Sequence, residues 1–319
     1  MKVLVTGGAG YIGSVVATKL VEAGHDVIVL DSLELGHENA VPKEARFIKT
    51  NITDIYKVLS PDDDIEAVLH FAAYMAAGES MNLPDKYWIN NTVGSLSLLE
   101  SMRKLNINKL IFSSTAAVYG NPETTPITEE ARTNPTSTYG QTKLAVDMAI
   151  TSYCHAYGIA ATSLRYFNVA GAYGNVGERH PVETHIIPLA LKAVKEEKSF
   201  NIYGNDYPTP DGTCIRDYIH IEDLADAHLL ALENLAQGQH SIFNLGNGNG
   251  FSNNEVVKAI EEVTGKKLPV VYTPRREGDP AILIASSDKA KKNLGWSPKK
   301  PTLNEIVKDA WDFYNLPTS

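Results

Sequence analysis

The chain has 319 residues, 43% of them hydrophobic and 21% charged, a composition that fits a folded globular protein and excludes large-scale disorder, a coiled coil and a collagen-like chain. Twenty-nine Lys and Arg stand against 38 Asp and Glu, and this net charge of −9 argues against nucleic acid and membrane surfaces as partners. Only two cysteines and a short apolar N-terminal run predict a reduced, cytoplasmic protein, and we predict no metal site.

The first half of the chain has the pattern of a parallel sheet. Up to about residue 165, short β-branched runs alternate with helical patterns, as expected for βαβ units with both faces of the sheet covered. The predicted strands are 2–6, 26–30, 46–50, 67–71, 109–113 and 161–166, and the predicted helices are 11–24, 84–105 and 138–157. We therefore predict an α/β fold with a Rossmann-type, doubly wound parallel sheet.

The second half is less regular. Clusters of Gly, Pro and Asn beyond about residue 170 predict a smaller C-terminal lobe, with helices at 186–197, 222–235, 252–264 and 303–315. The apolar run at 240–248 predicts one more buried strand that returns to the first sheet, and the lysines from 289 to 300 are interpreted as a solvated face. The expected division is therefore 1–170 for a nucleotide-binding domain and 171–319 for a substrate-binding lobe.

A glycine-rich turn follows the first predicted strand. The sequence TGGAGYIG places Gly7, Gly10 and Gly13 between strand and helix, where a dinucleotide site needs a tight turn, a close approach to pyrophosphate and close helix packing. The amino terminus of the helix then favours the pyrophosphate charge. The alternative is a glycine-rich turn that binds nothing.

Asp31 ends the second predicted strand, where a carboxylate bonds the ribose hydroxyls of NAD and repels the extra phosphate of NADP. NAD is therefore the predicted cofactor. Asp54 is predicted either to accept a bond from the adenine amino group or to cap a helix. His70, at the end of the fourth strand, is assigned to the core in preference to the cofactor site, and Asn90, in a predicted helix interior, either contacts the site or lies on the helix surface.

Tyr139 and Lys143 lie four residues apart in a predicted helix, so their side chains share one face. A tyrosine that acts as a base near neutral pH needs its pKa lowered by roughly three units, equivalent to about 4 kcal/mol. We expect the ammonium group and a positive nicotinamide ring to supply this shift together. Thr115 follows the fifth strand, at the edge where open α/β sheets bind ligands, and is the predicted hydroxyl partner of a substrate oxygen.

Together these features resemble the extended short-chain dehydrogenase/reductase family over essentially the whole chain. The segments SLRYFNVAGA (163–172), GNDYPTPDGTCIRDYIHIEDLADAH (204–228), NLGNG (244–248) and PRREGDP (274–280) are similar to the nucleotide-sugar 4-epimerases within it. This resemblance implies an isomerase that interconverts UDP-galactose and UDP-glucose through a transient 4-keto sugar, with tightly bound NAD. It also implies a homodimer paired through helices 84–105 and 138–157.

The resemblance also implies roles for individual residues. Tyr139, Lys143 and Thr115 are the expected catalytic residues. NAD is expected to contact Gly7, Gly10, Tyr11, Ile12, Gly13, Asp31, Asp54, Ile55, Phe71, Ala72, Ala73, Asn90, Ser113, Tyr139, Lys143 and Tyr166. The UDP-sugar is expected to contact Thr115, Tyr139, Phe167, Asn168, His185, Tyr203, Arg216, Arg276, Asp279 and Leu283. The two arginines would bind the diphosphate, because guanidinium groups make paired hydrogen bonds with phosphate oxygens.

Three positions depart from the family pattern. Tyr74-Met75 stands where some members have a lysine, His185 replaces an asparagine, and Leu283 replaces a bulky tyrosine of members strict for glucose and galactose. The smaller Leu283 predicts that UDP-N-acetylhexosamines also react.

Other activities of the same family stay open as alternatives. These are a UDP-glucuronate 4-epimerase and another NAD-dependent nucleotide-sugar epimerase or dehydrogenase. A 4,6-dehydratase is disfavoured, because Ala116 and Ala117 occupy the places of its carboxylate pair.

Overall fold

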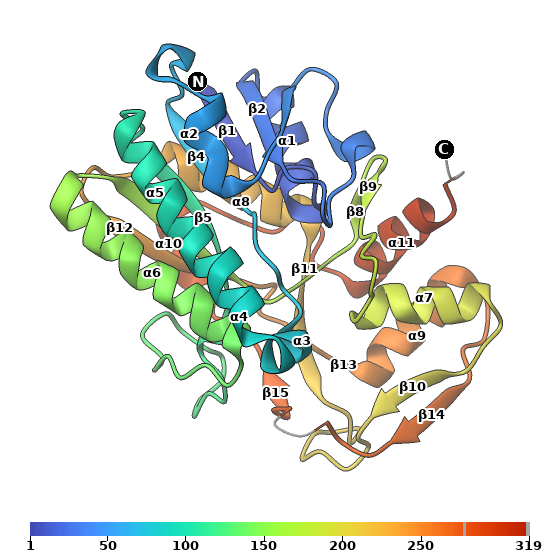
Figure 1. Cartoon of the computed structure of the whole chain (residues 1–319). Coiled ribbons are helices and arrows are strands. Elements are labelled where there is room, and N and C mark those ends of the chain that lie inside the picture. The colour runs from blue at the N-terminus through green and yellow to red at the C-terminus, as the bar shows by residue number, and fades with distance from the viewer. Residues whose placement is uncertain (277–278, 317–319) are drawn as a thin grey trace.

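The computed structural model describes residues 1–276 and 279–316, and its larger part is built on one parallel sheet (Figure 1). The strand order is β12-β6-β5-β4-β1-β2-β3. The strands are β1 (Lys2–Thr6), β2 (Asp26–Asp31), β3 (Arg46–Lys49), β4 (Ala67–His70), β5 (Lys109–Thr115), β6 (Ala160–Tyr166) and β12 (His240–Leu245). This is the doubly wound order with one added strand, so the predicted fold class is confirmed. The strand expected at 240–248 is β12, which pairs with β6.

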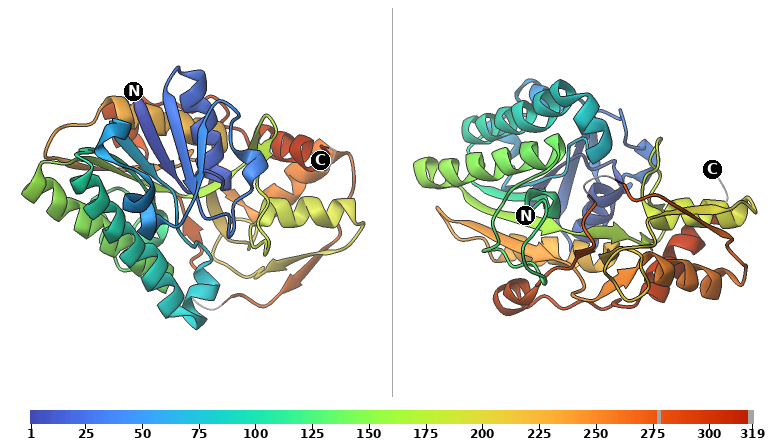
Figure 2. Two further views of the ribbon diagram at one scale, coloured as in Figure 1. Left: turned by 45° about the horizontal axis from the view of Figure 1, so that its top comes forward. Right: turned by 90° about the horizontal axis from the view of Figure 1, so that it is seen from below.

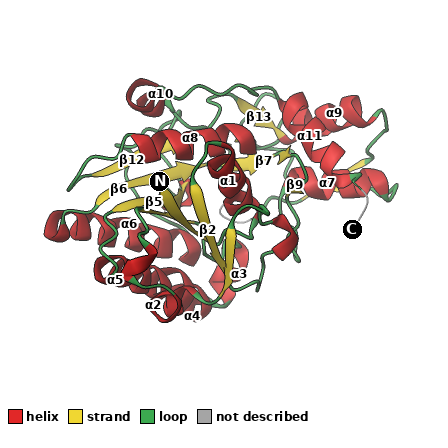
Figure 3. Ribbon diagram, turned by 90° about the horizontal axis from the view of Figure 1, so that it is seen from above, coloured by secondary structure: helices red, strands yellow, loops and turns green. Residues whose placement is uncertain are grey.

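The side chains of β1 explain why both faces of the sheet are covered. Val3 and Val5 belong to a core cluster shared with α1 (Tyr11–Glu22) and α8 (Ile221–Glu233). Leu4 belongs to the cluster on the opposite face, shared with α5 (Gly94–Lys104) and α6 (Thr138–Tyr157). Because successive strand residues point to opposite faces, a fully apolar strand requires helices on both sides, as Figure 3 shows.

The helix predicted at 84–105 is interrupted. It consists of α4 (Pro84–Tyr87), a π-helical turn η4 (Trp88–Val93) and α5. Within η4, Asn91 is buried; its amide group donates to the Tyr74 carbonyl at 2.9 Å and accepts from the Tyr74 N–H at 2.8 Å. A wider turn that serves such a tertiary contact is typical of functional sites.

The solvated face predicted for the lysines from 289 to 300 includes one side of a helix that the sequence did not predict, α10 (Asp288–Leu294). Its Ala290 and Leu294 are buried with Trp296 in the core cluster that the sheet shares with α1 and α8. The charged residues of α10 therefore cover one side of a helix whose other side is core.

The smaller part packs α7 (Ile186–Lys195), α9 (Asn253–Thr264) and α11 (Leu303–Tyr314) around a third core cluster. Its strands are β7 (Asn168–Ala170), β8 (Ala172–Tyr173), β9 (Val176–Gly177), β10 (Phe200–Tyr203), β11 (Ile215–His220), β13 (Gly250–Ser252), β14 (Val270–Thr273) and β15 (Ile282–Leu283). The larger part also contains the short helices η1 (Glu38–Ala40), η2 (Ile52–Asp54), α2 (Ile55–Val58), η3 (Pro61–Asp63), α3 (Ala77–Asn82) and η5 (Ala116–Val118). Figure 2 shows the two parts side by side.

The chain passes between the two parts more than once. One residue after β6, strand β7 pairs with β11 of the smaller part, and β12 later returns to the large sheet. The predicted domain boundary at 170 therefore falls at the end of a strand that already belongs to the smaller sheet. Among residues 1–276 and 279–316, no helix has the length and apolar character that crossing a membrane requires.

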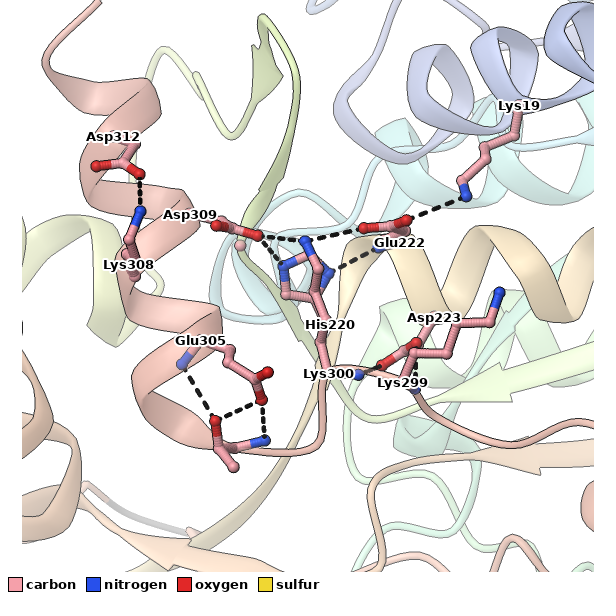
Figure 4. A network of polar contacts seen from close by, with 12 residues as sticks. Lys19, His220, Glu222, Asp223, Lys299, Lys300, Glu305, Lys308, Asp309 and Asp312 are labelled. Carbon is pink, nitrogen blue, oxygen red and sulfur yellow. Dashed lines mark hydrogen bonds and ion pairs between the residues drawn. The ribbon is translucent and has the colours of Figure 1, made fainter.

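Charged side chains on α1, α8 and α11 connect the two parts of the molecule (Figure 4). Asp309 of α11 accepts contacts from His220 at 3.0 Å and from the Lys300 ammonium at 2.6 Å. Lys300 also lies 2.9 Å from Glu222 of α8, which in turn lies 3.3 Å from Lys19 of α1. Charge pairing therefore adds to apolar packing in fixing α11 against the first helix of the larger part.

Candidate active site

A cavity of about 360 Å³ lies where the carboxyl ends of the strands meet the smaller part. It brings together eighteen of the predicted residues: Gly7, Gly10, Tyr11, Ile12, Gly13, Asp31, Phe71, Ala72, Ala73, Asn90, Ser113, Thr115, Tyr139, Lys143, Tyr166, Phe167, Asn168 and His185. It does not include Asp54, Ile55, Tyr203, Arg216, Arg276, Asp279 and Leu283. The cofactor residues and the proton-transfer residues thus share one cavity, whereas part of the sugar-nucleotide set lies outside its lining.

The glycine turn leaves no room for side chains. Gly7 has a φ of +71°, and a Cβ atom there would lie 2.5 Å from the Ala72 nitrogen. A Cβ atom at Gly13 would lie 2.3 Å from the carbonyl oxygen of Gly7. Gly10 begins α1 without a capping side chain, and the first turn of this helix has no acidic residue, so free N–H groups line the cavity. These features fit the pyrophosphate of a dinucleotide.

Asp31 connects the glycine turn to the loop after β2. One carboxylate oxygen accepts from the Ala9 N–H at 3.0 Å and the other from the Leu33 N–H at 2.8 Å. The side chain also lines the cavity, next to the turn, as the adenosine end of NAD requires.

Asp54 occupies the N-cap position of α2, one of its two predicted places, but its side chain makes no capping hydrogen bond. It lies outside the cavity lining, precedes α2 without a capping hydrogen bond and pairs with Lys57 at 2.7 Å. The capping side chain in this region is Asn51, which accepts from the Thr53 N–H. Ile55 is fully buried in the core cluster that the sheet shares with α5 and α6, which explains why it does not reach the cavity.

Tyr139 begins α6, where its N–H donates to the Ser80 hydroxyl at 3.0 Å. One turn later, the Lys143 ammonium donates to the carbonyl of Ser113 at 2.6 Å. Thr115, the last residue of β5, lies close enough to the Tyr139 side chain to lower the pKa of the phenol. A phenol, an ammonium group and a hydroxyl therefore meet at the end of one strand, as the sequence predicts.

Burial shifts the pKa of both Tyr139 and Lys143. Burial raises the pKa of Tyr139, and the nearby Thr115 hydroxyl offsets this only in part. Burial also lowers the pKa of Lys143 from 10.5 to about 7, against the opposing charge of Asp147. These residues by themselves disfavour both charged forms, so the downward shift expected from the ammonium group and the nicotinamide ring together stays a prediction.

Lys143→Met is expected to become more stable relative to the wild type as the pH falls toward 7. In the unfolded chain the lysine pKa is 10.5, whereas in the folded chain it is about 7, so the folded state binds fewer protons between these values. The cost of burying the ammonium group is complete below pH 7 and disappears as the pH rises toward 10.5. Urea unfolding at pH 6, 8 and 9.5 measures this change. Exposed Lys266→Met is the control, and a difference that does not vary with pH would contradict the shift.

Four of the predicted substrate residues form two pairs on the smaller part, one of them at Arg216 near the start of β11. Arg216 forms an ion pair with Asp279, and the Arg276 guanidinium lies 4.1 Å from the centre of the Tyr203 ring. Both arginines thus have local partners, which a diphosphate would have to displace. On the cavity side, Asn168 is fixed by a bond of 3.1 Å from its amide to the Asp217 carbonyl.

Leu283 lies on β15, in register with Arg216 of β11. Its side chain packs against a small apolar cluster of Val118, Tyr119 and Ile127. Phe167, which lines the cavity, packs against the same cluster. Leu283 is therefore linked by packing to the cavity wall, although it does not line the cavity itself.

The sequence predictions missed several residues of this region. His70 is a core residue, as assigned, with partners Thr6 and Ser95 at 2.8 Å each and a pKa that burial lowers to about 3. Asn91, next to the predicted Asn90, is the asparagine that holds the cavity loop. The cavity lining also contains Glu34, His37, Glu178, Arg179 and His180. Asn91 had a visible signal, a second asparagine inside an otherwise helical segment, and Glu178 and His180 had another, because they belong to a repeated Glu-x-His pair.

Residues 3–246 match the NAD dependent epimerase/dehydratase family. The chain is 55% identical over 315 residues to the UDP-glucose 4-epimerase of Corynebacterium glutamicum, and the match covers 98% of this chain and 95% of that relative. The crystal structure of UDP-glucose 4-epimerase from Brucella ovis in complex with NAD has a TM-score of 0.94, with 41% identity and 99% coverage of each chain. The enzyme from Bifidobacterium longum in complex with NAD+ and UDP has a TM-score of 0.91, with 36% identity and 98% coverage of each chain.

Proposed function

The chain belongs to the NAD dependent epimerase/dehydratase family, and from this premise we propose that it interconverts UDP-glucose and UDP-galactose by inverting carbon 4 of the hexose. The observation that carries the proposal is the cavity in which the glycine turn, Tyr139 and Thr115 meet. A dinucleotide site and a proton-transfer group within one cavity suit an oxidation that is reversed on the same substrate.

NAD is the cofactor that these residues fit. Gly7 and Gly13 allow the tight turn and the close helix packing, Gly10 leaves the start of α1 open to the pyrophosphate, and Asp31 is proposed to bind the adenosine ribose. When bound, NAD supplies a hydride acceptor and donor for carbon 4 and a positive ring charge in the same cavity. That positive charge is the contribution that the phenol of Tyr139 lacks in the residues alone.

Tyr139 is the proposed base and acid of both half-reactions. It removes the proton from the 4-hydroxyl during oxidation and returns a proton to the 4-keto oxygen during reduction. Thr115 supports it, because its hydroxyl stabilises the phenolate and lowers the tyrosine pKa. Lys143 fixes the end of β5 through Ser113, and below pH 7 it adds a positive charge to the cavity wall.

The UDP part is proposed to lie against the smaller part of the molecule. Arg216 and Arg276 supply two guanidinium groups for the diphosphate, and Asp279 is released from Arg216 when the diphosphate binds. The Tyr203 ring lies beside Arg276, and the Asn168 amide, which donates to the Asp217 carbonyl, lines the cavity. Both are proposed to contact the nucleotide or sugar.

Proton NMR of UDP-galactose, mixed with purified protein and no added NAD, tests the function. Appearance of UDP-glucose supports both the 4-epimerisation and a retained cofactor. Activity that requires added NAD keeps the chemistry and rejects tight binding. If neither condition gives product, UDP-glucuronate is the next substrate to test, and net accumulation of NADH instead of epimer would indicate a dehydrogenase.

Leu283→Tyr is expected to abolish the reaction of UDP-N-acetylglucosamine while sparing UDP-glucose. Leu283 packs on the cluster that also supports Phe167 of the cavity wall. A tyrosine ring at this position would therefore leave less room for a 2-acetamido group. Measured kcat/KM for the two substrates checks this expectation. Leu283→Met, with nearly the same volume, is the matched control and should leave both reactions unchanged. An equal loss for both substrates in Leu283→Tyr would reject the selective role.

We also infer that the protein is a cytoplasmic homodimer. Support for the pairing comes from Ile89, Val93 and Met148, apolar side chains that are 64%, 53% and 66% exposed on η4 and α6. These elements pack side by side and form one outer face (Figure 1). Support for the compartment comes from Cys154 and Cys214, which are both buried free thiols. Sedimentation equilibrium should give twice the mass of one chain, with Ile89→Asp shifting it toward the monomer.

A further inference from the structure

Four potential metal ligands meet on the segment that joins β9 to α7 (Figure 1). They are Glu178, His180, Glu183 and His185, two copies of a Glu-x-His pair within eight residues. One ligand atom from each residue lies within 4.8 Å of all the others. The cysteine spacings predict no metal site, but this repeated Glu-x-His pair is a usable sequence signal.

The distances suit one small cation. The Nδ1 atom of His180 lies 3.1 Å from a Glu178 oxygen and 3.5 Å from a Glu183 oxygen. The Nδ1 atom of His185 lies 2.6 Å and 3.1 Å from oxygens of the same two glutamates. In a tetrahedral zinc site with bonds of about 2.0–2.2 Å, neighbouring ligand atoms lie roughly 3.3–3.5 Å apart. Three of these four contacts come within about 0.2 Å of that spacing, and the contact between His185 and Glu178 would lengthen as a metal ion entered between them.

One of these contacts is not explained by hydrogen bonding. The Nδ1 atom of His180 is buried, yet it makes no hydrogen bond with acceptable angles, although two carboxylate oxygens are near. The Nδ1 atom of His180 thus lies near two carboxylate oxygens without a hydrogen bond to either of them. A metal ion between them would satisfy this atom and the carboxylates together.

The ligand types identify the class of metal. Two imidazoles and two carboxylates suit zinc or a similar first-row divalent ion, whereas magnesium and calcium prefer oxygen ligands alone. Since the protein itself supplies all four ligands, no open position is left for a substrate, which is the arrangement of a structural site. We propose that Glu178, His180, Glu183 and His185 bind one zinc ion that fixes the rim of the cavity.

The position of the cluster shows what the metal would hold. Glu178, His180 and His185 line the cavity, and His185 is also the residue from which α7 begins. Between the ligands, Arg179 donates to Asn39 at 3.0 Å and its carbonyl contacts the His37 ring at 3.0 Å. A metal that fixes the segment 178–185 would therefore fix the contact between the smaller part and the loop that follows β2.

Without a metal, the four residues form a compact set of ion pairs. Burial opposes charge on the imidazoles, but the two carboxylates outweigh it and raise the pKa of His180 to about 9 and that of His185 to about 10. This set of ion pairs is the competing interpretation. It predicts no retained metal and no change on adding one, so the two interpretations give opposite results.

Metal analysis of the untagged protein separates them. After exposure to zinc and dialysis into metal-free buffer, mass spectrometry should find one zinc per wild-type chain, and Co²⁺ in its place should give the intense visible bands of tetrahedral cobalt. Glu183→Gln and His180→Gln should each reduce retained zinc to well below one per chain. Their matched controls are the exposed Glu123→Gln and His155→Gln, which should keep it. Absence of retained zinc together with the weak spectrum of aqueous cobalt in the wild type would overturn the proposal, whatever the variants do.

Discussion

Tyr139→Phe is expected to lower kcat by about 10²–10⁴-fold, the range that a positioned acid-base group contributes. The substitution removes only the hydroxyl, so the proton of the 4-hydroxyl loses its acceptor while the cavity keeps its shape. The start of α6 should stay in place, because the hydrogen bond to Ser80 is made by the main-chain N–H of residue 139. Bound NAD should therefore be retained, and its absorbance on the purified variant measures this directly.

The control for this variant is Tyr56→Phe, which removes a hydroxyl from an exposed tyrosine that is not part of the cavity lining. It should leave kcat and bound NAD unchanged. Retained turnover in Tyr139→Phe would remove Tyr139 from the role of base. Loss of NAD together with activity would instead assign the tyrosine to cofactor binding.

Asp147→Asn is expected to lower the free energy of unfolding by about 3–5 kcal/mol, because it leaves a buried guanidinium without a counter-charge. Asp147 accepts from Arg165 at 2.9 Å and from the Ser114 hydroxyl at 3.1 Å, and both members of the ion pair are nearly inaccessible. The same carboxylate raises the pKa of Lys143, so the variant should also deprotonate that lysine at a lower pH. Urea unfolding and the pH profile of kcat measure the two effects.

The matched control is Asp312→Asn, which removes the same charge from an exposed pair with Lys308 on α11. Because such surface pairs contribute little, unfolding should not change measurably. Replacing both buried partners, as in Asp147→Leu with Arg165→Met, should cost less than Asp147→Asn alone. If the single substitution proved as mild as the surface control, the Tyr119 hydroxyl, 3.0 Å from Arg165, would be a sufficient partner.

The parts of the fold that the sequence predicts are those determined by local pattern. The apolar run around Val3, Leu4 and Val5 can only be a strand covered on both faces, and the pairing of Ser252 with Glu255 marks the start of α9. Likewise, Gly7 and Gly13 stand between strand and helix with no room for a side chain, so their spacing alone locates the cofactor end of the cavity.

The features that the sequence does not predict depend on contacts between distant residues. The π-helical turn at η4 serves a bond between Asn91 and Tyr74, and neither residue shows this in its own segment. The ion pair of Arg216 with Asp279 joins positions 63 residues apart. The pKa of Tyr139 depends on burial, which spacing along a helix does not report.

The edge position of β12 has a consequence for biosynthesis. Strand β6 ends at Tyr166 and its neighbour β12 begins at His240, so 73 residues lie between them in the chain. At about 5–20 residues per second, the ribosome needs several seconds to make that length. During this time the nascent sheet exposes the hydrogen-bonding edge of β6, which can pair with other chains. We expect nascent chains arrested between 170 and 240 to need a chaperone to stay unaggregated, and chains that include β12 to be released from it.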